Sequence, residues 1–250
     1  MTIKDPGFNS EQAIQRKDYM RSLFETQAKN YDFHDDVYGL YAHRLWVLSP
    51  LDEIKKFMKG RAAAKMLDLA CGTGFIIFNV ARRHPNIDID GFDLSPEMIA
   101  IAKERCDQKF KDRSINLWLG DAEIPYAENK YDIITVSFGF RNFANKNLAV
   151  ENAYKALKPG GIFIIQDLTK PERQPFRGLY LFYMKYLLPL FTKILGTEKT
   201  AAGWLLKSVL LMPKNSEIKA LLKEKGFEGV FYRSLTFGIA CMVGGYKPKE

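Results

Sequence analysis

The sequence predicts an α/β fold: a doubly wound, mostly parallel seven-stranded sheet, with N-terminal helices and a helical insert before the last two strands. From residue 65 onward, short apolar segments of strand length alternate with segments of helix length, a pattern typical of parallel sheets. A long apolar helical stretch over 171–212 then interrupts this alternation. The chain ends in two adjacent strand-like segments, which indicates an antiparallel pair that finishes the sheet.

The elements are expected in a regular order along the chain. The N-terminal part should hold two helices, over 11–28 and 38–58. Apolar runs bounded by turn residues predict five strands, at 65–70, 87–93, 115–120, 131–138 and 162–168. Between them we expect helices at 75–83, 96–108 and 148–157, and a turn at the sequence KPGG, 158–161. The last third predicts apolar helices at 176–195 and 200–211, an amphipathic helix at 216–225, and strands at 229–238 and 239–247.

Composition and charge narrow the class of protein. The chain has 250 residues and three sparse cysteines, which favours reduced thiols in the cytoplasm. No apolar run approaches the length of a spanning helix, so we expect no transmembrane segment. The net charge of +8 lies entirely in residues 170–250, which hold 14 Lys or Arg against 6 Asp or Glu. This surplus indicates a surface that meets an anionic membrane or an acidic ligand, or else a solvated lysine-rich face.

A glycine turn follows the first predicted strand. The sequence LDLACGTG, at 67–74, places Gly72 and Gly74 between a strand and a helix, where the backbone can approach a ligand and the helix offers unpaired N–H groups. Asp93 ends the second strand, 19 residues after Gly74, and can accept hydrogen bonds from ribose hydroxyls. This arrangement predicts an adenosine-containing ligand.

The third glycine of a dinucleotide site is replaced by Ile77, which weakens the case for a nicotinamide cofactor. Asp68, in the first strand, instead suits the ammonium group of S-adenosyl-L-methionine. The sequence GDAE, at 120–123, places Asp121 and Ala122 where they would contact the adenine. Alternatively, the glycines form only a turn and Asp121 caps a helix.

At this point the chain resembles class I S-adenosylmethionine-dependent methyltransferases, whose fold is Rossmann-like. More narrowly, it is similar to the ubiquinone/menaquinone biosynthesis C-methyltransferases from about residue 22 to 247. The residues that carry this resemblance are HRLW (43–46), LDLACGTG, TVSFGFRNF (135–143), AYKALKPGGIF (153–163), SLTFGIA (234–240) and GYK (245–247).

The resemblance implies methylation of a ring carbon in a prenylated quinol, either a demethylmenaquinol or a ubiquinol precursor, during respiratory quinone biosynthesis. It implies one methyltransferase domain over 1–250, with a substrate cap at 10–60, a cofactor-binding core at 65–170, a helical insert at 171–212, and a C-terminal helix and strand pair at 213–250. The cofactor contacts expected from the motifs and the resemblance together are Asp68, Gly72, Thr73, Gly74, Asp93, Leu94, Asp121, Ala122 and Ser137.

Several positions depart from the family pattern. Asp35 stands where the family usually has asparagine, and Gly39 and Tyr41 where it has serine and glycine. In the insert, Ala202 and Trp204 replace two tyrosines, and Asp167 replaces a glutamate after the fifth strand. All of these lie where the acceptor is expected to bind. The substrate-binding candidates are Asn142, Asp35 and Trp204.

The chemistry suggests three catalytic candidates, in the order Arg141, Tyr31 and His43. A quinol carbon becomes nucleophilic when the adjacent hydroxyl is deprotonated, which requires a base near it. Arg141 stays protonated and would stabilise the phenolate or orient a water, while Tyr31, His43 and Asp35 are candidate bases. The alternatives are a structural ion pair for Arg141, a core position for Tyr31 and a helix surface for His43. No metal is needed.

The apolar residues of the insert are compatible with several kinds of contact. Its aliphatic and aromatic residues would line a tunnel for a polyprenyl tail, cover the sheet, or form the contact of a homodimer. With the local basic charge they favour peripheral contact with the inner face of the cell membrane. The competing functions are a methyltransferase for another lipophilic small molecule, a nicotinamide oxidoreductase and a nucleic-acid binder. The last is disfavoured because no nucleic-acid motif is evident.

Overall fold

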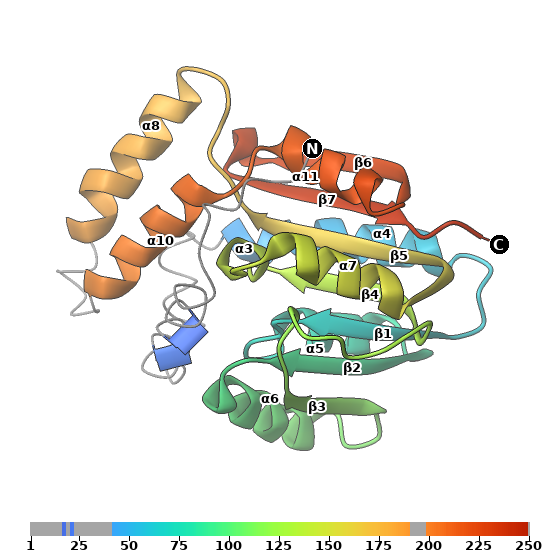
Figure 1. Cartoon of the computed structure of the whole chain (residues 1–250). Coiled ribbons are helices and arrows are strands. Elements are labelled where there is room, and N and C mark those ends of the chain that lie inside the picture. Colours follow the sequence, from blue (N-terminus) through green and yellow to red (C-terminus); the bar gives the residue numbers. More distant parts are fainter. Residues whose placement is uncertain (1–16, 19–20, 23–41, 191–198, 250) are drawn as a thin grey trace.

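The computed structural model describes residues 17–18, 21–22, 42–190 and 199–249, which form a seven-stranded sheet flanked by helices (Figure 1). The strand order is β3-β2-β1-β4-β5-β7-β6. Strands β1 to β5 are parallel, whereas β7 runs antiparallel to both of its neighbours. The predicted fold class is thereby confirmed. The strands are β1 (Ala64–Leu69), β2 (Ile87–Asp93), β3 (Ile115–Leu119), β4 (Tyr131–Ser137), β5 (Leu157–Leu168), β6 (Glu228–Leu235) and β7 (Ala240–Tyr246).

The helices follow the expected order, with differences at their ends. They are α3 (Ala42–Trp46), α4 (Leu48–Met58), α5 (Phe75–Arg83), α6 (Pro96–Lys109), α7 (Lys146–Ala156), α8 (Phe176–Phe182), α10 (Lys199–Leu211) and α11 (Asn215–Glu224), with short helices η2 (Phe140–Asn142), η3 (Tyr183–Leu187) and η4 (Thr236–Gly238). The single helix expected over 38–58 is therefore two helices within the described residues. The helix expected over 11–28 lies almost wholly outside them.

Two local predictions need correction. The sequence KPGG was expected to be a turn, but it belongs to β5, where the pairing shifts from Tyr131–Leu157 to Ile133–Ile162. Gly160 has the positive φ of 75° that a turn would need. Its N–H donates to Lys247 O at 2.9 Å, so the turn residues still pair with a neighbouring segment and form an irregular part of the strand. The strand expected over 229–238 ends at Leu235 and continues as η4.

Polar side chains cap the first turns of α6 and α7. Ser95 precedes α6, and its hydroxyl accepts a hydrogen bond from Met98 N at 3.3 Å, with Pro96 at the first helical position. Asn145 caps α7 in the same way, accepting from Leu148 N at 2.9 Å. These caps satisfy backbone donors that the helices cannot satisfy themselves.

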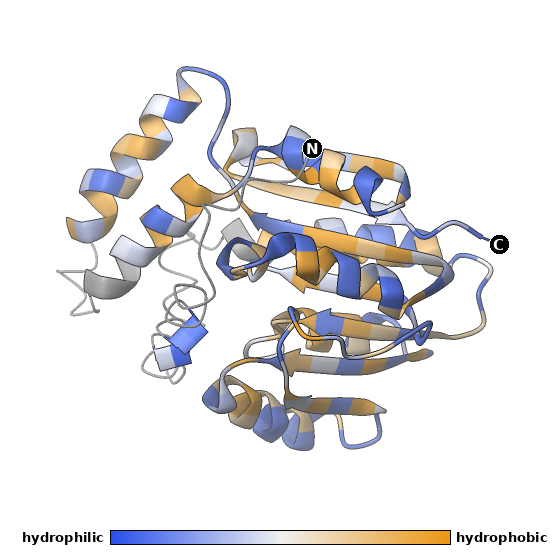
Figure 2. Cartoon of the chain, in the orientation of Figure 1, coloured by the Kyte–Doolittle hydropathy of each residue, from blue (hydrophilic) through white to orange (hydrophobic). Residues whose placement is uncertain are grey.

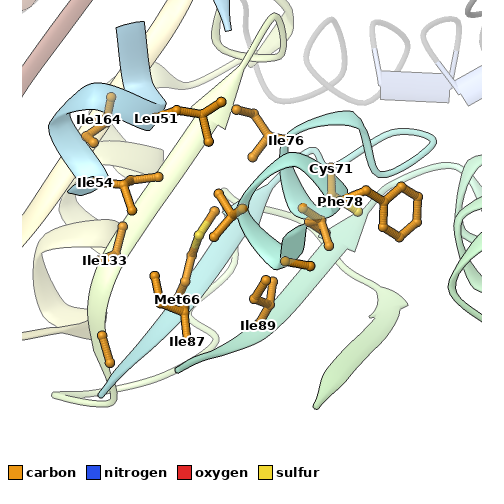
Figure 3. Close-up of a cluster of buried hydrophobic side chains, with 14 of the residues drawn as sticks. Leu51, Ile54, Met66, Cys71, Ile76, Phe78, Ile87, Ile89, Ile133 and Ile164 are labelled. Atoms are coloured by element: carbon orange, nitrogen blue, oxygen red, sulfur yellow. The ribbon is translucent and has the colours of Figure 1, made fainter. Parts of the chain in front are cut away.

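The core has two layers, one on each face of the sheet. Figure 3 shows the layer beneath α4 and α5, where Met66 of β1, Ile133 of β4 and Ile164 of β5 meet Ile54 and Ile76. The residues next to them in the strands, such as Leu67 and Ile134, point to the opposite face, which α7 and α11 cover. The centre of the sheet is thus buried on both sides, which explains why β1, β4 and β5 read as apolar runs.

The insert forms a separate pair of helices beyond one end of the sheet, where α8 and α10 lie (Figure 1). Their contact is a small cluster of Tyr180, Met184, Leu188 and Val209. Helix α10 also contacts η2, at the carboxyl end of β4. Among the described residues, no helix combines the length and apolarity needed to span a bilayer.

Candidate active site

A large cleft opens at the carboxyl ends of β1, β2 and β4 and beside the loop after β3. Its empty volume is about 1310 Å³, part of it open to solvent. This is the edge at which open parallel sheets bind ligands. Eight of the nine predicted cofactor residues line the cleft; the exception is Gly74, the N-cap of helix α5. The tertiary structure therefore brings three separate sequence motifs into one cavity.

The glycine turn is held by Asp93. The two oxygens of this carboxylate accept hydrogen bonds from Gly72 N and Ser95 N, both at 2.9 Å. Burial raises the pKa of Asp93, and the backbone donors act against that rise. A carboxylate has about four acceptor positions, so Asp93 can brace the turn and still accept from a ligand hydroxyl.

Asp68 lies at the floor of the cleft and is almost fully buried. Thr135 donates its hydroxyl proton to Asp68 Oδ1 at 2.5 Å. Burial raises the pKa of Asp68 to about 7, and the neighbouring charge of Asp93 acts in the same direction. A carboxyl group in this state gains from a cationic ligand, because a nearby positive charge favours its ionised form.

The third acidic position is already paired. Lys17 Nζ contacts Asp121 Oδ2 at 2.7 Å and Glu123 Oε2 at 2.9 Å. Burial lowers the pKa of Lys17, but these hydrogen bonds outweigh it, so the pKa lies above its usual value. Ala122 beside them is buried, and its carbonyl accepts from Asn152 Nδ2 at 3.0 Å. Sequence reasoning missed Lys17, because nothing in its local sequence marks a contact 104 residues away.

Strained backbone marks the ends of β1 and β4. Ala70 and Phe138 have φ angles of 52° and 59°, in the left-handed region that residues with a side chain rarely adopt. Ser137, the last residue of β4, has a buried hydroxyl oxygen with no hydrogen-bond partner in the described part of the chain. Because buried polar groups are normally satisfied, this oxygen indicates a position for a ligand.

Arg141 is buried and paired with Asp167. Its backbone N–H donates to Asp167 Oδ2 and its Nη1 to Asp167 Oδ1, both at 2.7 Å, and Nη1 also donates to Phe138 O. The Arg141 side chain is 8% exposed, and that of Asp167 is fully buried. Arg141 does not line the cleft itself, whereas Asn142 and Phe143 do. The ion pair considered from the sequence is therefore present, and its partner is one of the positions that depart from the family pattern.

The insert reaches this end of the site from outside the sheet. Trp204 of α10 donates its indole N–H to Asn142 Oδ1 at 3.2 Å, which joins two of the predicted substrate-binding residues. Tyr180 of α8 lies near the ion pair: burial raises its pKa, while the charge of Arg141 lowers it. Sequence reasoning did not single out Tyr180 as a neighbour of Arg141.

Residues from three motifs that are far apart in the sequence come together next to Phe138. The Trp46 indole donates to Thr236 Oγ1 at 2.7 Å, and the Trp46 carbonyl accepts from Gln166 Nε2 at 2.5 Å. The rings of Trp46 and Phe138 lie 6.2 Å apart. The segments HRLW, FGFRN and LTFGI thus support one another around the end of β4.

Three predicted residues cannot be placed in this site. Tyr31 and Asp35 lie outside the described residues, as do Gly39 and Tyr41. His43 belongs to α3, but its side chain is not described. Their roles stay predictions.

The cleft fits S-adenosyl-L-methionine on its own features. It combines a buried carboxyl at Asp68, a second acid at the end of β2, a third acid after β3, and a hydroxyl at Ser137 with no partner among the described residues. These are the groups needed to receive an ammonium, a ribose and an adenine. The strand order is that of the class I methyltransferase fold, whose members use this cofactor.

Comparison with known proteins identifies the family. The chain matches the ubiE/COQ5 methyltransferase family over residues 12–247, and it belongs to that family. It is 30% identical over 236 residues to the demethylmenaquinone methyltransferase of Staphylococcus aureus, strains JH9 and Newman, covering 94% of this chain and 95% of that protein. The cofactor is therefore S-adenosyl-L-methionine, and the chain is a C-methyltransferase for a small-molecule acceptor.

Solved structures agree on the fold. Phosphoethanolamine N-methyltransferase 2 of Haemonchus contortus, in complex with phosphomonomethylethanolamine and S-adenosylhomocysteine, aligns with a TM-score of 0.61 at 16% identity, covering 86% of this chain and 59% of that one. An S-adenosylmethionine-dependent methyltransferase of Thermotoga maritima aligns with a TM-score of 0.61 at 18% identity, covering 90% and 99%. At such identities the likeness concerns the fold alone.

Proposed function

We propose that this enzyme methylates a ring carbon of a prenylated quinol, a demethylmenaquinol or a ubiquinol precursor, in respiratory quinone biosynthesis. The observation that carries the proposal is the arrangement at the end of β4, where Asn142 lines the cofactor cleft, hydrogen-bonds to Trp204 of the insert, and adjoins the buried Arg141. The identity to a demethylmenaquinone methyltransferase supports it. In this proposal residues 10–60 cap the acceptor, and the enzyme works from the cytoplasm at the inner face of the cell membrane.

In this proposal, different residues of the cleft bind different parts of S-adenosyl-L-methionine. Asp68 holds the ammonium, Asp93 the ribose hydroxyls, and Asp121 with Ala122 the adenine. Gly72, Thr73, Gly74 and Leu94 let the backbone approach the ligand, and Ser137 Oγ gains a partner that it lacks in the described chain. Bound there, S-adenosyl-L-methionine supplies an electrophilic methyl group.

The acceptor half must generate a carbon nucleophile. Removing a proton from the quinol hydroxyl places electron density on the neighbouring ring carbon, and the phenolate needs a positive partner. Arg141 suits this role because its guanidinium stays charged and Asp167 fixes its direction. Tyr31, His43 and Asp35 are the bases proposed for the proton. Aligning the two reactants supplies much of the catalysis.

A second candidate is a methyltransferase for another lipophilic small molecule. The supporting observation is that two positions unlike the family pattern, Asp167 and Trp204, are those that contact Arg141 and Asn142. The differences therefore concentrate on the acceptor side, where a change of substrate would be expressed.

Labelled S-adenosyl-L-methionine and a panel of short-tailed demethylquinols separate the two candidates. Methylated quinol of the expected mass supports the first, and complementation of a host lacking its quinone C-methyltransferase would extend this to cells. Turnover of another lipid, with no methylated quinol, would replace the first candidate by the second.

A further inference from the structure

The segment formed by α8, η3 and residues 188–190 has two apolar sides. On one side Tyr180, Met184 and Leu188 pack against Val209 and Leu205 of α10. This inner side leads toward the active site, because Tyr180 lies near Arg141 and α10 carries Trp204. The burial of these residues accounts for one face of the helix and leaves the opposite face unexplained.

The opposite side exposes large apolar residues at a spacing of three to four. They are Leu179, Phe182, Tyr186 and Leu190, with exposed fractions of 68%, 51%, 55% and 51%, and we call them the outer apolar face. Figure 2 shows that apolar residues recur along this helix, which lies at the edge of the molecule. Large apolar side chains that gather on an exposed surface mark a contact with another molecule or with a membrane. The outer apolar face therefore needs a cover that the described chain does not supply.

A second feature extends this surface at its N-terminal end. Phe237, in the turn between β6 and β7, is 70% exposed and has a strained φ of 55°. Its ring stacks on that of Phe176 at 4.4 Å, almost parallel. An exposed aromatic held on strained backbone indicates a constraint other than stability.

Charge identifies the kind of cover. Arg177 and Lys185 are exposed on the same segment, and Arg173 is exposed just before it. Between residues 170 and 190 the sequence has these three cations and Lys170, against one acid, Glu172. Aromatic and aliphatic side chains bordered by cations fit the boundary of an anionic bilayer. A second copy of this chain fits less well, because the contact would bring two sets of the same cations together.

We propose that the outer apolar face docks onto an anionic lipid surface. The inference rests on the proposed function in one respect: docking there places the inner side of the insert, and the acceptor side of the site behind it, next to the membrane that holds a prenylated acceptor. The insert then serves two roles, membrane contact outside and acceptor binding inside.

Vesicle flotation of the full chain tests the proposal. We expect binding to vesicles of phosphatidylcholine mixed with phosphatidylglycerol and much weaker binding to phosphatidylcholine alone. The double variant Leu179→Ser/Phe182→Ser should bind the mixed vesicles roughly tenfold more weakly or worse, because two inserting side chains are lost. The matched control is Leu119→Ser, which removes a leucine of similar exposure, 52%, from the edge strand β3 and should bind like the parent chain.

A charge-reversal pair tests the electrostatic part. Arg177→Glu/Lys185→Glu should weaken binding to the mixed vesicles several-fold, and added salt should weaken the parent chain in the same way. The control reverses two exposed lysines on α6, Lys103→Glu/Lys109→Glu, with the same change of net charge. Equal losses in both variants would mean that only the total charge matters, which overturns the proposed surface.

Two measurements keep the outcomes distinct. Methylation of a short-tailed, water-soluble acceptor should be unchanged in Leu179→Ser/Phe182→Ser. A loss of vesicle binding in this variant is then distinct from a failure of the proposed function. A parent chain that methylates this acceptor but ignores anionic vesicles would overturn the docking surface and leave the function standing. A dimer that the double variant converts to monomer, without vesicle binding by either, would assign the face to a second copy instead.

Discussion

The buried pair of Arg141 and Asp167 determines which way the guanidinium points at the end of β4. Asp167 accepts from both the backbone and the side chain of Arg141, and also from Leu168 N at 2.7 Å. An arginine among aromatic residues would be costly to bury alone, and this carboxylate is what compensates its charge. Asp167 is thus a positioning residue: it holds the group proposed to meet the acceptor.

Replacing Asp167 should cost both stability and turnover. Asp167→Asn leaves the arginine charge uncompensated, and we expect the free energy of unfolding to fall by about 3 kcal/mol or more, measured by urea denaturation. The control Glu151→Gln removes an exposed partner of Lys155 and Lys225 and should cost less than about 1 kcal/mol. If Asp167 acts by positioning, Asp167→Glu should recover part of kcat. Equal stability of Asp167→Asn and the parent chain would contradict the pair.

Asp68 should make cofactor binding depend on pH. Its pKa of about 7 in the free protein means that the carboxyl is mostly protonated below that pH, whereas the cofactor ammonium prefers the ionised form. Affinity for S-adenosylhomocysteine should therefore rise with pH, by at most about tenfold per pH unit below 7, and level off above it. Isothermal titration over this range measures the profile.

Two variants test whether Asp68 is the group responsible for this pH dependence. Asp68→Asn should bind more weakly and lose the pH dependence. Thr135→Val removes the hydrogen bond that lowers the pKa of Asp68, so the midpoint should move to higher pH. A midpoint unmoved by Thr135→Val, or a pH dependence that survives in Asp68→Asn, would assign the titration to another group.

At the scale of elements, the site depends on how closely the ends of β1 and β4 approach each other. A Cβ atom added at Gly139 would lie 2.7 Å from the Cβ of Ala70, closer than real side chains come. The φ of Gly139 is −104°, so its glycine is required by space and not by conformation. The two strand ends can meet here only because one of them carries no side chain.

This approach predicts a coupled pair of substitutions. Gly139→Ala should destabilise the protein by about 1–3 kcal/mol and weaken cofactor binding, because the two turns that line the cleft are forced apart. Adding Ala70→Gly removes the opposing Cβ and should recover much of the loss. A double-mutant cycle on the free energy of unfolding measures the coupling, and strictly additive effects would refute the contact.

Helix α10 connects the insert to the site through one hydrogen bond. Trp204→Phe keeps an aromatic ring but loses the indole donor to Asn142, so KM for the acceptor should rise several-fold while affinity for S-adenosylhomocysteine stays unchanged. The control Tyr232→Phe removes an exposed hydrogen bond to Asn215 and should change neither quantity. A change in cofactor affinity alone would show that Trp204 serves the other half of the cleft.

At the scale of the whole molecule, residues 1–169 and residues 170–250 contribute different features. Residues 1–169 carry no net charge and include β1 to β5. The cleft lies at the carboxyl ends of β1, β2 and β4 and beside the loop after β3. The remaining residues carry the full surplus of positive charge, complete the sheet with β6 and β7, and provide the insert. Cofactor binding and the proposed membrane contact are thus assigned to different regions that meet at Arg141 and Asn142.

Sequence reasoning located the central strands well because their apolar runs are buried on both faces. It also singled out residues that line the cleft, because the glycine turn and the acids lie at strand ends, while their roles toward the cofactor stay predictions. It misjudged KPGG, where pairing with neighbouring strands extends β5 through a local turn signal. It also gave no sign of Lys17 or Tyr180 as neighbours of the site, since each contact joins segments far apart in the chain.

By itself, the sequence determined the alternation of strands and helices, the glycine turn with its following acids, and the family motifs around Arg141. These depend on local periodicity and on residue types with special backbone or charge properties. Only the tertiary structure decided that Asp167 compensates Arg141, that Trp204 reaches Asn142, and that one side of the insert stays exposed. These are long-range pairings and differences in burial, and no local pattern encodes which distant surface a side chain will meet.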